Sequence, residues 1–185
     1  MPSSAKKKAC YEDLFTLPDN MVGEIISGEL VATPRPGPRH TIAASALGSE
    51  ICGPFQLGKG GPGGWWILDE PELHLNEHVL VPDLAGWKKE RLPSISEEKG
   101  FLLPPDWICE LVSPSTARHD RIRKMPIYAE SGVQYLWVID PLAQTFEAFM
   151  LESCKWVLVA THAENEKIRA KPFQEIELDL SLLWA

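Results

Sequence analysis

The stretch Trp107-Ile108-Cys109-Glu110-Leu111-Val112 decides the fold of this chain. A short continuous run of apolar residues is typical of a strand that is buried on both faces of a sheet. Glu110 lies inside the run, and a carboxylate in apolar surroundings is costly unless something compensates it. The run therefore predicts a buried strand whose one acidic side chain has a specific partner.

A second acidic residue, Asp83, follows Pro82 at the expected end of another short apolar strand, Val79 to Val81. Two strands that each offer one carboxylate can meet at a divalent cation, and carboxylate oxygens suit Mg²⁺ and Mn²⁺. Lys124 follows on a basic stretch, where it can face the anion that the cation binds. These residue types are the working parts of a metal-dependent phosphodiesterase.

The order of the elements predicts a mixed α/β domain with one central sheet. The chain should kink or start a helix late at Pro126, and Gly132 fits a helix C-terminal cap. The expected elements are a β-hairpin over 21–33 that turns at Ser27-Gly28, a helix over 40–52, strands over 65–75 and 78–81, a helix over 117–131, a strand over 133–140 and a hairpin over 145–160.

The bulk numbers predict one soluble domain. The chain has 185 residues, of which 44% are hydrophobic and 24% charged, and we expect a flexible tail over 1–10 followed by a single domain over 11–185. No apolar run approaches the roughly 18 residues of a membrane span, and the start of the chain lacks a secretory signal. Four cysteines without paired spacing indicate reduced thiols in a cytoplasm. The net charge of -8 argues against broad, nonspecific binding of nucleic acid.

Each central residue also has a purely structural interpretation. Asp83 could cap a turn, and Glu110 could form a salt bridge with Arg118 or Arg121. Lys124 could be an ordinary exposed helix lysine. Arg118 and Arg121 lie in a basic cluster over 118–124, which could contact phosphate or form a solvated helix face.

Four further residues are candidates for supporting roles. Asp120, one turn before Lys124, could orient the lysine or cap the helix, while Tyr128 on the same face is expected in the core. Glu24 interrupts an apolar strand as Glu110 does, so it could be an extra ligand, an orienting carboxylate or an exposed residue of the hairpin. His40, near a helix start, could approach a phosphate, transfer a proton or cap the helix.

With these residues in view, the chain resembles the Uma2 family of restriction endonuclease-like proteins, formerly a family of unknown function. The resemblance covers residues 12 to 182, and its motifs are specific through their order and spacing. They are Gly23 to Val31, Arg39-His40, Val81 to Leu84, Cys109 to Thr116, Asp120, Lys124, Tyr128 and Gly132 to Pro141.

The family resembles the PD-(D/E)XK nuclease superfamily, which implies a mixed central β-sheet flanked by helices. By this resemblance Asp83 is the aspartate of the PD element and Glu110 is the second acidic residue. The lysine expected two residues later is replaced by Val112, and the family supplies it from the following helix, here as Lys124.

The resemblance implies a Mg²⁺- or Mn²⁺-dependent endonuclease that cleaves DNA in a bacterial cytoplasm, and it is compatible with a homodimer. The alternative is a catalytically degenerate module on the same fold that binds nucleic acid or protein. Its support is the acidic net charge, the loss of the lysine at Val112 and the proline close to Lys124.

Overall fold

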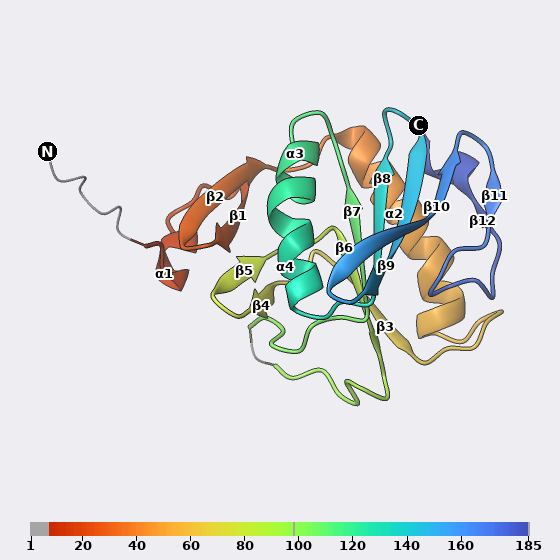
Figure 1. Cartoon of the computed structure of the whole chain (residues 1–185), viewed down its shortest axis with the longest axis horizontal. Helices are drawn as coiled ribbons and strands as arrows, with labels where there is room; N and C mark the ends of the chain where they lie inside the picture. The colour runs from red at the N-terminus through yellow and green to blue at the C-terminus, as the bar shows by residue number, and fades with distance from the viewer. Residues whose placement is uncertain (1–7, 98, 185) are drawn as a thin grey trace, which may run out of the picture.

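A six-stranded sheet is the centre of the computed structural model, which describes residues 8–97 and 99–184 (Figure 1). Its strand order is β10-β9-β8-β7-β6-β3, and β7 and β8 are its parallel pair. The strands are β3 (Trp65–Asp69), β6 (Leu84–Lys88), β7 (Trp107–Leu111), β8 (Tyr135–Asp140), β9 (Thr145–Glu152) and β10 (Lys155–Ala163). The predicted strand around Glu110 is thus confirmed as β7, and every residue of it is buried.

Helices cover both faces of this sheet (Figure 1). On one face α2 (Pro38–Ile51) buries Leu47 and Ile51 in a cluster with Trp107 and Trp137. The parallel connection from β7 to β8 crosses the other face. It consists of α3 (Ala117–His119), a π-helical turn (Asp120–Lys124) and α4 (Met125–Glu130), and α4 packs Tyr128 in a second apolar cluster.

A smaller four-stranded sheet of order β2-β1-β5-β4 lies beside α3 and α4 (Figure 1). Its strands are β1 (Met21–Ile26), β2 (Glu29–Pro34), β4 (Leu73–Leu75) and β5 (His78–Leu80), and the short α1 (Tyr11–Leu14) precedes it. The predicted hairpin is confirmed, because Ile26 pairs with Glu29 across a turn in which Ser27 and Gly28 have φ values of 54° and 75°. A two-residue turn with two positive φ values matches the twist of a hairpin.

Near the C-terminus, β11 (Lys167–Ile168) pairs with β12 (Leu178–Asp179), and a 3₁₀ turn (Leu180–Leu183) follows. Leu180 and Leu183 are buried in the same apolar cluster as the α2 residues. This last segment therefore docks on the face of the large sheet that α2 covers.

A proline accounts for the irregular helix that carries Lys124. Met125 N–H donates to the carbonyl of Asp120, five residues earlier, so the turn is one residue wider than an α-helical turn. Pro126 then occupies the start of α4, where the missing N–H costs nothing. The prediction that Pro126 would kink the helix or start it late is confirmed, and so is the cap at Gly132, which has a φ of 81°.

Two sequence predictions about strands are wrong. The single strand expected over 65–75 is divided at Glu70, which has a positive φ of 44° and precedes Pro71, so β3 and β4 belong to different sheets. The strand β6 is not among the predicted elements. Asp83 therefore stands just before β6 rather than at the end of the preceding strand, since β5 ends at Leu80.

The predicted class of fold, a mixed central sheet flanked by helices with an N-terminal hairpin, is confirmed. Residues 1–7 of the expected tail lie outside the described residues, while Ala9 N–H donates to the carbonyl of Gly28 at 2.8 Å. In the part of the chain that the structure describes, no helix has the length and apolar character needed to cross a membrane.

Candidate active site

Asp83 and Glu110 lie side by side because their strands are neighbours. Leu84 of β6 pairs with Cys109 of β7 in antiparallel register. Asp83 precedes Leu84 and Glu110 follows Cys109, so the two carboxylates come at the same end of the strand pair. Asp83 Oδ2 accepts a hydrogen bond from Leu111 N–H at 2.6 Å, and its Oδ1 lies 3.0 Å from His40 Nε2. The Asp83 carboxylate is therefore held from two sides by β7 and by the start of α2.

Lys124 enters the site from the π-helical turn and is 4% exposed. Its Nζ lies 2.8 Å from Glu110 Oε1, 3.1 Å from Glu24 Oε1 and 3.1 Å from the carbonyl of Val81. A lysine ammonium has three N–H donors, so each of them has an acceptor here. The exposed-lysine interpretation of Lys124 is wrong, and the lysine is the cation that compensates Glu110.

Glu24 joins the smaller sheet to this cluster. It is 4% exposed on β1, accepts a hydrogen bond from Val81 N–H at 2.9 Å through Oε1, and has its Oε2 3.2 Å from His119 Nε2. Of the interpretations open for Glu24, exposure on the hairpin is wrong. His119 is not among the residues predicted for the site, because no local pattern pairs it with a carboxylate 95 positions earlier.

Tyr128 and Asp120 complete the surroundings of Glu110 and Lys124. Tyr128 is fully buried, as expected for a core residue, and its hydroxyl donates to Glu110 Oε1 at 2.6 Å. Asp120 is buried with Oδ1 3.9 Å from Lys124 Nζ. Both contacts to Glu110 use Oε1, and its Oε2 accepts no hydrogen bond from the described residues.

Burial and the shared lysine set the protonation of these groups. Burial raises the pKa of Glu110 well above its usual range, and Lys124 opposes the rise. Burial also raises the pKa of Asp120. Burial opposes ionisation of Glu24, but Lys124 and the hydrogen bonds from His119 and Val81 outweigh it and hold its pKa at about 2.

Lys124 keeps its proton despite its burial. Burial alone would lower its pKa, but Glu110, Glu24 and Asp120 together raise the pKa well above the usual value. A lysine that stays charged cannot act as a general base near neutral pH. It acts instead as a fixed positive charge.

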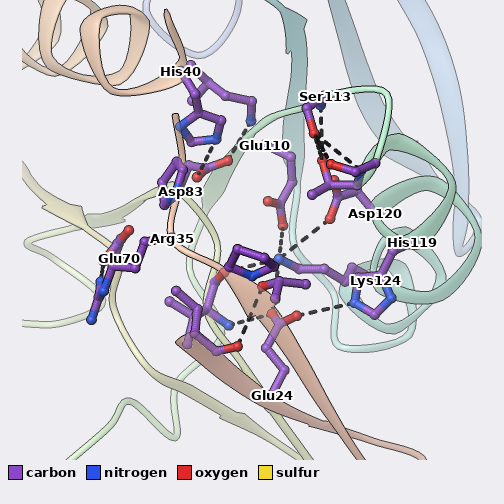
Figure 2. Close-up of a pocket in the computed structure, with 18 of the residues that line it drawn as sticks. Glu24, Arg35, His40, Glu70, Asp83, Glu110, Ser113, His119, Asp120 and Lys124 are labelled. Carbon is purple, nitrogen blue, oxygen red and sulfur yellow. Dashed lines mark hydrogen bonds and ion pairs between the residues drawn. The ribbon is translucent and has the colours of Figure 1, made fainter. Parts of the chain in front are cut away.

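The site carries more negative than positive groups. Five carboxylates line one hollow of about 260 Å³ together with a single lysine, as Figure 2 shows, and the five are Glu24, Glu70, Asp83, Glu110 and Asp120. Arg35 also lines this hollow, but it is paired with Glu70 at 3.0 Å. Crowded carboxylates in a poorly solvated place must take up protons or a cation.

The two arginines proposed as phosphate contacts do not join this cluster. Arg121 pairs with Glu147 of β9 at 2.6 Å and lines a different hollow. Arg118 is exposed and forms no ion pair with a described residue. The alternative in which Arg118 or Arg121 neutralises Glu110 is therefore wrong.

The donor set fits a hard divalent cation through two carboxylates. Among residues 8–97 and 99–184, no group of three or more His, Cys, Asp and Glu side chains is arranged to hold a metal. Mg²⁺ nevertheless keeps several waters and is usually bound through one or two carboxylates plus the phosphates of the substrate. The unbonded Glu110 Oε2 and the remaining lone pairs of Asp83 supply that number of oxygen ligands.

The chain is therefore a mixed α/β protein in which two acidic residues at adjacent strands meet a buried lysine from the helical connection between β7 and β8. The chain belongs to the Uma2 family, described as "Putative restriction endonuclease", whose model matches residues 11–182. The predicted family is confirmed. The fold is similar to the crystal structure of a putative nuclease of the DUF820 family from Anabaena variabilis, with a TM-score of 0.74 and 22% identity over 94% of this chain and 96% of that one. None of the curated proteins matches this chain.

Proposed function

We propose that this chain is a metal-dependent endonuclease that hydrolyses phosphodiester bonds of DNA. The observation that carries the proposal is the excess of buried carboxylates around one lysine, in a hollow that opens to solvent. Membership of the Uma2 family supports a nuclease. The choice of DNA and of a divalent cation rests on the resemblance to PD-(D/E)XK nucleases and on the oxygen ligands described above.

Asp83 and Glu110 would hold Mg²⁺ or Mn²⁺. A bound cation of this kind supplies activation of water and stabilises charge on a phosphoryl oxygen. Leu111 N–H and His40 orient Asp83. Tyr128 and Lys124 fix Glu110 through Oε1, which leaves Oε2 as the oxygen for the cation.

Lys124 would offset the negative charge that develops at the reacting phosphate. Its three donors are already satisfied, so direct contact with a phosphate would require it to release one acceptor. Asp120 lies close enough to orient the ammonium during such an exchange. His40 would contact the phosphate or transfer a proton only by releasing Asp83, because its Nε2 is bonded to that carboxylate and its Nδ1 is buried.

A second candidate is the degenerate binding module on the same fold. The observation that favours it is the full pairing of Lys124, which gives the lysine a structural task in the absence of any substrate. Such a module would have no need for a divalent cation. A homodimer and a bacterial, cytoplasmic setting remain predictions from the family resemblance.

The test is nicking of supercoiled plasmid with Mg²⁺ or Mn²⁺. Wild type should nick the plasmid, and Asp83→Asn and Glu110→Gln should each reduce the rate at least 100-fold, within the range of a metal or electrostatic contribution. Glu147→Gln is the matched control, because Glu147 belongs to a different hollow. Nicking that survives in both site variants, or absent nicking in wild type, would contradict the proposal.

A further inference from the structure

A second hollow, of about 300 Å³, adjoins the candidate active site. It lies where the start of α2 meets the ends of β7 and β8. Gly37, His40 and Ser113 line both hollows, so the two spaces share a wall. Whatever occupies the first hollow therefore lies next to the occupant of the second.

The chemistry of the second hollow differs sharply from that of the first. None of its lining residues carries a carboxylate, and its walls are mainly aliphatic and proline side chains, namely Pro38, Val112, Pro114, Pro141 and Leu142. Arg39 is exposed at this hollow and forms no ion pair with a described residue. Apolar walls with one arginine fit a flat heterocycle, which can pack against the walls and stack on the guanidinium. They lack the carboxylates that a hard metal ion needs.

The apolar wall is held open in advance. Leu142 is 59% exposed, which is costly for a large aliphatic side chain. Its N–H and that of Ala143 both donate to Asp140 Oδ1 at 2.9 Å, so the turn after β8 has a fixed shape. Pro141, between Asp140 and Leu142, is buried. A ligand that covers Leu142 would gain apolar burial without first having to order this turn.

We propose that this hollow binds one nucleobase of the strand whose phosphate lies at Asp83 and Glu110. The inference rests on the proposed function and narrows its substrate class. A base inside a duplex is stacked and paired, so it enters a pocket only after being unstacked. The preferred substrate is therefore DNA with an unpaired nucleotide beside the scissile bond, such as a single strand, a flap or a frayed end.

The first test measures binding without hydrolysis. Fluorescence anisotropy at low salt, with Ca²⁺ in place of Mg²⁺ or Mn²⁺ so that the carboxylates are neutralised, follows a labelled single-stranded deoxyoligonucleotide, its matched duplex, and the same single strand made with abasic nucleotides. Intact oligonucleotide on a gel confirms that no hydrolysis occurs. Wild type should bind the single strand more tightly than the other two by about fivefold or more, the scale of covering part of one large aliphatic side chain. Equal affinity for the base-containing and abasic strands, or no binding of the single strand, would overturn the inference.

A variant locates the effect in this hollow. Leu142→Ser should weaken binding of the single strand by about the same factor and should abolish the preference over the abasic strand, because it removes the aliphatic surface that the base covers. Leu158→Ser on β10 is the control, since Leu158 is also exposed, at 49%, but does not line the hollow. Because Leu142 is largely exposed, the variant should fold, which its circular dichroism and unfolding temperature check. Unchanged preference in Leu142→Ser would overturn the assignment.

Three further outcomes distinguish this inference from the proposed nuclease function and from a protein interface. Base-dependent binding without metal-dependent cleavage would support the nucleobase site and refute the proposed nuclease function. Metal-dependent cleavage with no preference for unpaired bases would support the nuclease function and refute the nucleobase site. Sedimentation of wild type as a dimer that Leu142→Ser dissociates, with oligonucleotide binding unchanged, would make the hollow a protein interface and overturn the inference.

Discussion

Replacement of Lys124 by methionine should strongly destabilise the fold. The methionine keeps much of the buried volume but removes the cation that lies 2.8 Å from Glu110, 3.1 Å from Glu24 and 3.9 Å from Asp120. Removing one partner of a buried ion pair typically costs about 3 to 5 kcal/mol, because the other charge is left uncompensated. For a chain of this size that cost corresponds to a fall in unfolding temperature of about 6 to 20 °C.

The loss of stability in Lys124→Met should increase as the pH rises. Without the lysine, the pKa of Glu24 in the folded state should rise above that of the unfolded chain, and the pKa of Glu110, which burial already raises, should rise further. A group with a raised folded pKa contributes stability that is fully present below its unfolded pKa and is lost as the pH rises through the folded pKa. The variant should therefore be closest to wild type near pH 4.5 and most destabilised above pH 7.

Thermal and urea unfolding followed by tryptophan fluorescence in EDTA, at several pH values between 4.5 and 8, would measure both effects. Lys155→Met is the control, because Lys155 is exposed and forms no ion pair with a described residue. It should change the free energy of unfolding by less than about 0.5 kcal/mol. A Lys124→Met variant as stable as this control, or one whose penalty grows as the pH falls, would refute the reasoning.

Three other outcomes follow from the same structure. Glu24, with its pKa of about 2 against 4.5 in the unfolded chain, contributes stability on the order of 3 kcal/mol that is lost as the pH falls from about 4.5 to 2. Urea unfolding of wild type and Glu24→Gln should therefore converge over that range, and a constant gap would contradict it. Gly86→Ala should cost about 1 to 3 kcal/mol in thermal unfolding, because the added Cβ would lie 3.1 to 3.3 Å from Ile67 and two tryptophans; no loss would show that β6 can shift freely. Arg121→Ala should leave plasmid nicking unchanged and should change the free energy of unfolding by less than about 1 kcal/mol, since this arginine pairs with Glu147 near the surface. A large fall in nicking would show that Arg121 contributes to the active site.

The sequence was informative where a residue contradicted its local pattern. Glu110 in an apolar run demanded a compensating cation, and Lys124 supplies it at 2.8 Å. The turn at Ser27-Gly28 and the cap at Gly132 follow from the left-handed backbone that glycine accepts at low cost. Pro126 predicted an irregular helix, although not that the turn before it would be π-helical.

The remaining features depend on long-range contacts that no local pattern encodes. Glu24 and Lys124 are far apart in the chain, and only the docking of the small sheet beside the helical connection brings them together. Strand β6 escaped prediction because Gly86 at its centre is an unfavourable strand residue, required here by the close approach of Trp65 and Trp107. The division of the segment over 65–75 depends on one positive φ, at Glu70.

Calorimetric titration with Mn²⁺ tests the central claim most directly, namely that the carboxylate excess around Lys124 exists to take up a divalent cation. We predict a single site in wild type that is lost in both Asp83→Asn and Glu110→Gln and retained in Glu147→Gln, which lies in another hollow. Binding of Mn²⁺ that is absent in wild type, or that is equal in all four proteins, would contradict the claim and favour the degenerate binding module.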